Sequence, residues 1–314
     1  MQHPYRVVAV SLLALPILLL AQAADLVRAV SKAAWAKDIP TAERLVTDYR
    51  QQHPEVTPQL LEAISWVGRG ASFAGQWDIA ERYARQAYDG SKALLAKRSL
   101  DADKSLPLAM GASIEVLGGA YNARGDRAGA VEFLTAERDR FKGTSIEMRL
   151  QKNINLLSLE GKPVPEIAMP QWVGAKPKSI AELKGQVVLT YFWAHWCGDC
   201  KREMPILHQL QAKYADRGLT ILGPTQFYGY VARGEDATPE QEMAYLRGDY
   251  QKQYPIPSWM SVPVSNQNFM RYGVSTTPTL MLVDRQGIVR LYHPGNLTFE
   301  ELSQKIEALL AART

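Results

Sequence analysis

The sequence predicts two domains in series, an all-α helical domain followed by an α/β sandwich. Residues 24–159 are rich in Ala, Leu, Glu and Arg, and no segment there alternates with period two. After a Gly- and Pro-containing break at residues 160–165, apolar strand-like runs alternate with helical segments. The length of 314 residues agrees with two domains of ordinary size.

Three segments of the helical domain resemble one another: residues 36–43, 75–84 and 124–131. Each places a turn-forming polar residue or glycine before an Ala-rich helix start, which is typical of the tight turn between two antiparallel helices. The domain resembles tetratricopeptide-type repeats, helix–turn–helix units of about 34 residues, although the spacing here is wider and irregular. Its aromatic side chains either fill the helix–helix core or line a peptide groove: Trp35, Trp66, Trp77, Tyr83, Tyr88, Tyr121 and Phe133.

The second domain, residues 160–314, is expected to start with a short hairpin and turn over residues 166–173 and 178–183. A buried strand over residues 187–193 follows, continuous in its apolar character. The later elements are expected in the order helix, strand, helix, short helix, hairpin and closing helix. Their ranges are 198–215, 219–223, 238–254, 266–272, 279–284 with 288–292, and 299–312. This order is that of an α/β sandwich.

Composition narrows the classes of function. The chain is 46% hydrophobic and 22% charged, as expected of a globular protein with a real core. Its formal charge of +4 is spread along the sequence without a basic run, so no nucleic-acid partner is expected.

The first 23 residues read as an export signal. Arg6 and the free amine give a positive start, residues 7–20 are apolar, and Ala21-Gln22-Ala23 provides a small-x-small pattern for cleavage before Ala24. The alternative is an uncleaved membrane anchor formed by residues 7–20, although this run is short for a bilayer span. Either way the chain is expected to be exported to the periplasm, where disulfides form and persist.

The chain contains two cysteines, Cys197 and Cys200, three positions apart. They follow the apolar run 187–194 and precede a predicted helix, so a strand delivers them to a first helical turn. The unpaired N–H groups and positive dipole end of that turn stabilise a thiolate. This arrangement predicts dithiol–disulfide exchange by the pair itself.

Residues 192–200 resemble the thioredoxin superfamily, and two further motifs narrow the resemblance. Residues 200–205, Cys-Lys-Arg-Glu-Met-Pro, are similar to the Cys-x-x-Glu-x-Pro signature of the exported TlpA/ResA type. Residues 273–280 and 283–287 are similar to that family's cis-proline loop and hairpin. The resemblance covers residues 161–314, about half of the chain.

The resemblance implies a mechanism. Cys197, at an exposed helix end, would attack a substrate disulfide, and Cys200 would resolve the mixed disulfide. Pro278, joined to Thr277 by a cis bond, would dock an extended substrate strand beside the sulfurs. Trp196 and Gly198 would flank the site.

Several residues near the cysteines depart from the commonest pattern or have an open role. Asp199 stands where most thioredoxins have proline, and its charge disfavours a thiolate at Cys197, which predicts a reductase or isomerase rather than a strong oxidant. Tyr191 stands where cytosolic thioredoxins have a buried aspartate. Glu203 is either a proton relay or a solvent-facing carboxylate paired with a nearby cation. His195 is expected on the loop surface. The aromatic, glycine-rich stretch 224–234 either shapes a substrate groove or is a mobile insertion.

The sequence thus predicts an exported thiol–disulfide oxidoreductase that reduces protein substrates through Cys197 and Cys200. It would need no bound cofactor and no metal, because the electrons reside in the cysteine pair. Its partners would be protein disulfides, an external membrane dithiol donor, and a protein bound by the helical domain. The alternatives are a partner-binding scaffold with a thioredoxin-like module and a carrier that holds Cu(I) between the two sulfurs. A peroxidase is disfavoured because the peroxiredoxin signature is absent.

Overall fold

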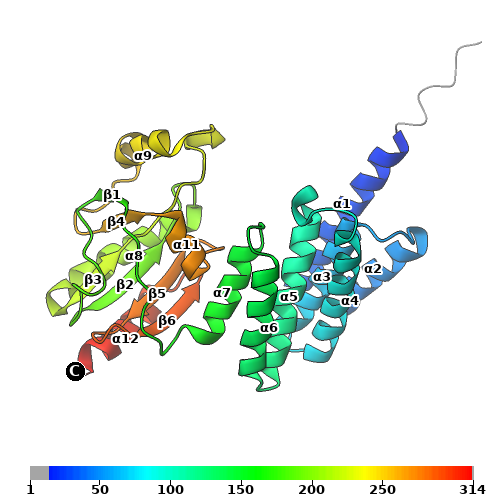
Figure 1. Cartoon of the computed structure of the whole chain (residues 1–314), viewed down its shortest axis with the longest axis horizontal. Coiled ribbons are helices and arrows are strands. Elements are labelled where there is room, and N and C mark those ends of the chain that lie inside the picture. The colour runs from blue at the N-terminus through cyan, green and yellow to red at the C-terminus, as the bar shows by residue number, and fades with distance from the viewer. Residues whose placement is uncertain (1–13, 313–314) are drawn as a thin grey trace, which may run out of the picture. The chain divides into compact units, whose positions relative to one another are not determined.

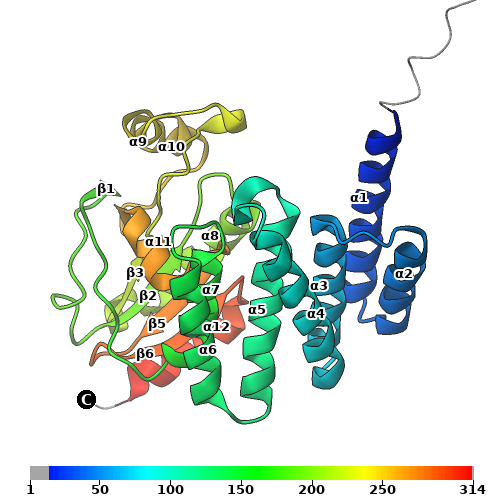
Figure 2. The same ribbon diagram turned by 45° about the vertical axis from the view of Figure 1, so that its right-hand side comes forward.

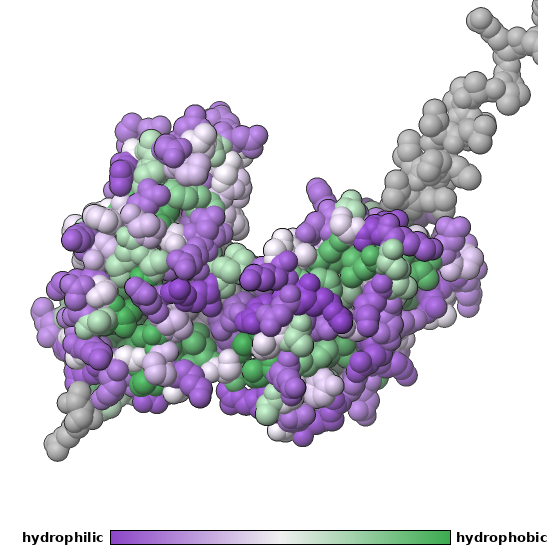
Figure 3. Space-filling model, viewed as in Figure 1, coloured by the Kyte–Doolittle hydropathy of each residue, from purple (hydrophilic) through white to green (hydrophobic). Residues whose placement is uncertain are grey.

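The chain divides into two compact units, Met1–Leu150 and Gln151–Thr314, in a computed structural model that describes residues 14–312 (Figure 1). Helix α7 (Glu147–Ser158) runs across this division. Most of α7 therefore belongs to the second unit, whereas the sequence places the boundary after residue 159. The visible face of each unit is covered mainly by hydrophilic residues (Figure 3).

The export signal falls only partly within the described residues. Residues 1–13, which include Arg6, lie outside them. From Ala14 onward the chain is helical, and α1 (Ala14–Trp35) continues through the expected cleavage point before Ala24. No helix in the described part of the chain combines the length and apolarity needed to cross a membrane.

The first unit consists of three helical hairpins, α1–α2, α3–α4 and α5–α6 (Figure 2). Its remaining helices are α2 (Ile39–Gln52), α3 (Pro58–Phe73), α4 (Trp77–Leu95), α5 (Ser105–Ala123) and α6 (Arg127–Arg140), with a short 3₁₀ turn at Leu100–Ala102. The expectation of an all-α first domain is confirmed.

The same turn closes all three hairpins. A residue with positive φ follows the first helix of each, namely Lys37 (58°), Gly75 (74°) and Gly125 (85°). The next N–H then bonds to a carbonyl five residues earlier, a C-terminal motif that satisfies a helix-end carbonyl. These bonds are Asp38 to Ala33 (2.9 Å), Gln76 to Ala71 (2.9 Å) and Asp126 to Tyr121 (3.0 Å). The three turns lie in the three segments that resemble one another in sequence.

Small residues allow the helices of this unit to approach closely. A Cβ added to Gly70 on α3 would lie 2.8 Å from the Cα and Cβ of Ala34 on α1. Its aromatic residues divide between two roles: Tyr88 is buried in the core, whereas Trp35 is 64% exposed. Trp35 stacks on Phe73 with ring centroids 5.1 Å apart, and the Arg69 guanidinium lies 4.3 Å from the Trp66 ring centroid. An aromatic cluster is therefore present at the surface of the helical unit.

A six-stranded mixed sheet forms the centre of the second unit, in the order β1-β4-β3-β2-β5-β6 (Figure 1). Strands β2, β3 and β4 run parallel, and the other neighbours pair antiparallel. The strands are β1 (Gln171–Gly174), β2 (Val187–Phe192), β3 (Leu219–Leu222), β4 (Ser261–Val264), β5 (Thr279–Val283) and β6 (Val289–Pro294). All six residues of β2 are buried, as expected of a central strand covered on both faces.

Helices cover both faces of this sheet. Side chains alternate along β2, so Leu189 and Tyr191 join the core formed with α8 (Gly198–Tyr214) and α12 (Phe299–Ala311). Phe192 points to the other face, where its ring contacts Phe269 and Tyr272 of α11 (Asn266–Tyr272). The predicted α/β sandwich is confirmed.

Two expectations for this unit are wrong. β1 does not form a leading hairpin but pairs with β4. Strand β4 is not predicted from the sequence, because it contains Pro263, whose backbone has no N–H to donate to a neighbouring strand. The expected helix 238–254 is two helices, α9 (Pro239–Arg247) and α10 (Asp249–Gln253), separated at Gly248.

Candidate active site

Cys197 and Cys200 lie at the junction between the central strand β2 and helix α8. Cys197 is the N-cap of α8, and its Sγ accepts the Cys200 N–H at 3.0 Å. The two cysteines form a disulfide with Cα atoms 5.2 Å apart. One N–H group of the first turn of α8 thus points at Cys197 Sγ, where it would stabilise a thiolate after reduction.

Exposure does not distinguish the two sulfurs in this oxidised state. Cys197 is 4% exposed and Cys200 2%. The expectation that Cys197 sits at an exposed helix end is therefore wrong for the disulfide form, because neighbouring loops cover it. Gly198 and Trp196, on either side of Cys197, are exposed, Trp196 by 48%.

A loop between α11 and β5 packs against the disulfide. The Thr277–Pro278 bond is cis. The Thr277 carbonyl oxygen lies 3.5 Å from Cys197 Sγ, and Thr279 Oγ1 donates to the Thr276 carbonyl at 2.7 Å. This loop therefore places the Thr277 carbonyl next to Cys197 Sγ.

The charged side chains at the start of α8 extend in different directions. Asp199 forms an exposed ion pair with Arg202. Lys201 turns the other way, and its ammonium lies 4.0 Å from the centroid of the Tyr254 ring. Arg202 therefore screens the Asp199 charge, while Lys201 lies against an aromatic surface instead of pairing with it.

Glu203 is buried rather than solvent-facing. Its side chain is 1% exposed, Oε2 accepts from Asn296 Nδ2, and Oε1 has no hydrogen-bond partner. Burial raises the pKa of Glu203, and the nearby Asp199 charge acts in the same direction. The interpretation as an exposed carboxylate paired with a cation is wrong. Glu203 is therefore a buried carboxyl one turn after Cys200, with a pKa raised above its ordinary value.

Comparison with known proteins agrees with this geometry. Residues 176–310 match the family described as thioredoxin-like domain. The chain is 29% identical over 148 residues to thioredoxin-like protein YneN of Bacillus subtilis, covering 47% of this chain and 79% of that protein. It is 28% identical over 149 residues to thiol-disulfide oxidoreductase ResA of Geobacillus thermodenitrificans, covering 48% and 77%.

Among solved structures, a putative thiol:disulfide interchange protein DsbE from Chlorobium tepidum is 30% identical. The match covers 48% of this chain and 98% of that one, with a TM-score of 0.39. The second unit contains a thioredoxin-like domain. The protein is a thiol–disulfide oxidoreductase, with Cys197 and Cys200 as its Cys-x-x-Cys pair.

Tyr191, expected at the position of the aspartate of cytosolic thioredoxins, lies beneath the cysteine turn of this thioredoxin-like domain. Its hydroxyl donates to the Cys200 carbonyl at 2.7 Å, and the side chain is fully buried. Burial raises the pKa of Tyr191 far above its ordinary value, and the Glu203 charge adds to this effect. Tyr191 therefore supports the turn but cannot serve as a base near neutral pH.

His195 is a residue of the thioredoxin-like domain that sequence reasoning misplaced. It is 3% exposed, and its ring meets Tyr228, Tyr230 and Tyr245 edge-on at centroid distances of 5.5–5.6 Å. Its Nε2 lies 3.4 Å from Oε1 of the fully buried Glu242 on α9. Burial lowers the pKa of His195 to about 4, and the Lys201 charge contributes, so the imidazole is neutral at pH 7. No local signal marks this burial, because the partners come from a later loop and helix.

Glu242 also orders the aromatic, glycine-rich stretch 224–234. Its carboxylate accepts the backbone N–H groups of Tyr228 (2.9 Å) and Gly229 (3.0 Å). The Tyr228 ring then packs edge-on against Trp196, with centroids 5.5 Å apart. The stretch is therefore held in place by Glu242 and packs against Trp196, next to Cys197.

Within residues 14–312 no group of three or more His, Cys, Asp or Glu side chains is arranged to hold a metal ion. The disulfide of Cys197 and Cys200 and the buried carboxyl of Glu203 lie together at the start of α8.

Proposed function

We propose that the protein is exported and reduces disulfide bonds of protein substrates with the Cys197–Cys200 dithiol. The observation that carries the proposal is the disulfide at the α8 N-terminus, where Cys197 Sγ accepts the Cys200 N–H and lies beside the Thr277 carbonyl. A thiolate at Cys197 would keep this N–H donor, whereas Cys200 lies within the helix.

The reaction has two exchange steps. In the first, the Cys197 thiolate attacks one sulfur of a substrate disulfide, a mixed disulfide forms, and the other substrate sulfur leaves as a thiolate. In the second, the Cys200 thiolate attacks Cys197 Sγ and displaces the second substrate sulfur. The substrate gains two electrons, and the enzyme ends in the disulfide state seen in the structure. An external dithiol must then reduce the enzyme.

Glu203 is proposed to take the proton of the Cys200 thiol in the second step. It is buried one turn after Cys200, has one oxygen without a partner, and is held by Asn296. With its pKa raised by burial, its proton affinity is closer to that of a thiol than an exposed carboxylate's would be.

The reducing direction is supported by the charges at the cysteine turn. Asp199 adds negative charge in the first turn of α8, which disfavours the Cys197 thiolate, and Arg202 offsets only part of it across an exposed pair. A less stabilised thiolate makes the disulfide form relatively more favourable and the dithiol a better reductant.

Export is supported by the sequence of the first 23 residues, with cleavage or anchoring through residues 7–20 as the two forms of the proposal. A membrane dithiol protein is the proposed electron donor, since the chain has no further cysteine pair. We propose that the three hairpins form a helical repeat that binds a partner protein. The exposed Trp35 stacked on Phe73 supports this role.

Insulin reduction by dithiothreitol tests the activity. The wild type should accelerate insulin precipitation, and both Cys197→Ser and Cys200→Ser should return the rate to that of dithiothreitol alone. Failure of the wild type to exceed the uncatalysed rate would sink the proposal. A wild type that instead holds Cu(I) against a chelator without accelerating the reaction would support the copper-carrier alternative.

A further inference from the structure

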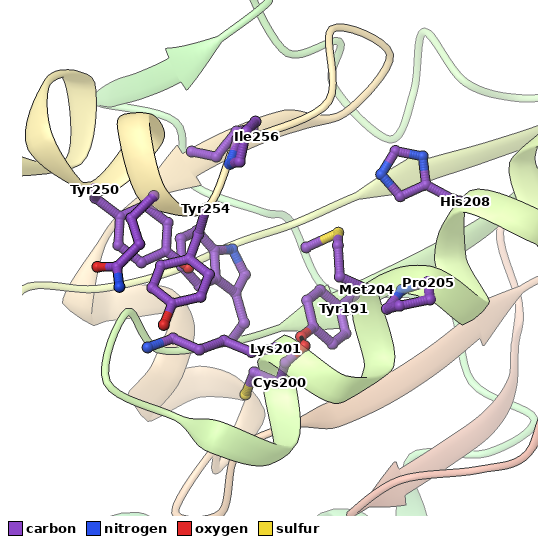
Figure 4. Close-up of a pocket in the computed structure, with 12 residues that line it drawn as sticks. Tyr191, Cys200, Lys201, Met204, Pro205, His208, Tyr250, Tyr254 and Ile256 are labelled. Atoms are coloured by element: carbon purple, nitrogen blue, oxygen red, sulfur yellow. Dashed lines mark hydrogen bonds between the residues drawn. The ribbon is translucent and has the colours of Figure 1, made fainter.

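A surface cavity of about 340 Å³ lies beside the cysteine turn, between α8 and the segment that follows α10 (Figure 4). One wall is a single face of α8, formed by Lys201, Met204 with Pro205, and His208, which repeat every three or four residues. The opposite wall comes from the chain around Tyr254 and Ile256. The floor is formed by Tyr191, Trp193 and Cys200, and Tyr250, Gln253 and Pro255 complete the lining.

The lining is aromatic and aliphatic. Tyr250 packs against both Trp193 and Tyr254, with ring centroids 5.4 and 5.5 Å apart, and these contacts keep the aromatic wall in place. Met204 adds a flexible thioether that adapts to an aromatic guest. Binding of an apolar group to this surface is therefore favourable, because it removes apolar area from water.

The charge at this cavity has one sign. Lys201 is the permanently charged residue of the lining, and its ammonium lies over the Tyr254 ring at 4.0 Å. His208 lies on the same helix face, and no lining residue among the described ones is a carboxylate. An apolar group that carries a neighbouring negative charge is therefore complementary to the cavity, and one next to a cation is not.

The volume limits the size of the guest. Small-molecule sites span about 300–1,000 Å³, so this cavity falls at the lower end. It can receive one aromatic side chain, but a dinucleotide or a macrocyclic cofactor would not fit.

The position of the cavity ties it to the exchange reaction. Cys200 lines the cavity and is bonded to Cys197, with the Cα atoms 5.2 Å apart. An extended chain advances about 3.3–3.6 Å per residue. A substrate whose cysteine is bonded to Cys197 can therefore place a side chain two or three residues away into the cavity.

We propose that this cavity is a specificity subsite for the reacting polypeptide, which receives an aromatic side chain next to an acidic residue, two or three positions from the substrate cysteine. The proposal rests on the proposed disulfide-exchange function. Lys201 selects the acidic neighbour, and Met204, Tyr254 and Ile256 hold the aromatic ring.

Four peptides test the subsite. Each carries one cysteine as a mixed disulfide with thionitrobenzoate, and Trp or Gly two residues away is combined with Glu or Lys as its neighbour. Prereduced full-length protein attacks the peptide sulfur and releases thionitrobenzoate, and Cys200 then displaces the peptide thiolate. Each second-order rate constant is divided by the same variant's rate constant with 5,5′-dithiobis(2-nitrobenzoate), which removes differences in thiol reactivity.

The wild type should prefer Trp over Gly by about tenfold, because partial burial of an aromatic ring is worth about 1.4 kcal/mol, which corresponds to a factor of ten. Ile256→Trp fills the cavity and should bring this ratio close to one, whereas Leu156→Trp, at an exposed position on α7, should leave it unchanged. Lys201→Gln should remove the preference for Glu over Lys. Lys305→Gln, at an exposed position on α12, should retain it.

A Trp-to-Gly ratio near one in the wild type, or an undiminished ratio in Ile256→Trp, would overturn the subsite while leaving the exchange activity in place. Absence of thionitrobenzoate release from the small disulfide would instead refute the proposed function itself. The two failures are therefore distinguishable.

Discussion

Substitution of Gly273 tests whether the second unit begins inside α7. Gly273 ends α11 with φ of 61°, and a Cβ added there would lie 2.6 Å from the carbonyl carbon of Gln151 and closer still to the Lys152 amide nitrogen. Gly287, in the β5–β6 turn, has φ of 83° but no atom within 4 Å of such a Cβ. The two glycines thus share a positive φ, which would strain any substituted residue, and differ in how closely other atoms approach the added Cβ.

The expected cost of each alanine substitution follows from these terms. The left-handed conformation costs a non-glycine residue about 1–2 kcal/mol, and overpacking adds about 1–3 kcal/mol. Gly287→Ala should therefore lower the free energy of unfolding of the second unit by about 1–2 kcal/mol. Gly273→Ala should lower it by about 2–5 kcal/mol, because backbone atoms of α7 cannot move aside like a side-chain tip.

Hydrogen exchange measured by mass spectrometry can follow each unit separately. Core amides of β2 and β5 should lose more protection in Gly273→Ala than in Gly287→Ala, both in the disulfide form. Amides of α3 in the helical unit serve as the internal control and should not change. Equal losses in the two variants would mean that residues 151–152 do not pack on Gly273, and the unit boundary would then lie later in the chain.

Three further predictions concern the charged groups around the cysteines. Glu203→Gln should slow the decay of the mixed disulfide by about a hundredfold and flatten its dependence on pH, so wild-type decay would exclude a proton-transfer role. Arg202→Gln removes the partner of Asp199 and should therefore raise the pKa of Cys197, as measured by alkylation. The rise should be less than about one unit, because two charges 4 Å apart in water interact by only about 1 kcal/mol. The pKa of His195 is lowered from 6.5 to about 4, so between these pH values the imidazole stays neutral in the folded protein but is protonated in the unfolded chain. The stability advantage of the wild type over His195→Asn should therefore shrink by up to about 3 kcal/mol as the pH falls from 6.5 to 4, and a constant difference in denaturant unfolding would contradict this.

Local patterns predicted most of the elements that position the site. The apolar run of β2, the start of α8 after the cysteine motif and the helix at residues 266–272 each depend on neighbouring residues in the sequence, and the structure contains all three. The motif around Cys197 and Cys200 is also local, so its place at the α8 N-terminus was predictable.

The errors share a physical cause, which is dependence on contacts distant in sequence. His195 is buried because Glu242 and three tyrosines close over it, and Glu203 is buried beneath Asn296 from the β6–α12 loop. β4 contains a proline and is a strand only because β1 and β3 pair with it.

The pH dependence of alkylation in the reduced wild type is the most direct test of the claim that Cys197 is the attacking sulfur of a reducing dithiol. Substoichiometric iodoacetamide followed by peptide mapping identifies the modified cysteine. We expect modification at Cys197, with half-maximal rate above about pH 5. Preferential modification of Cys200 would contradict the assignment of roles, and a midpoint below about pH 5 at Cys197 would place the protein among the oxidants.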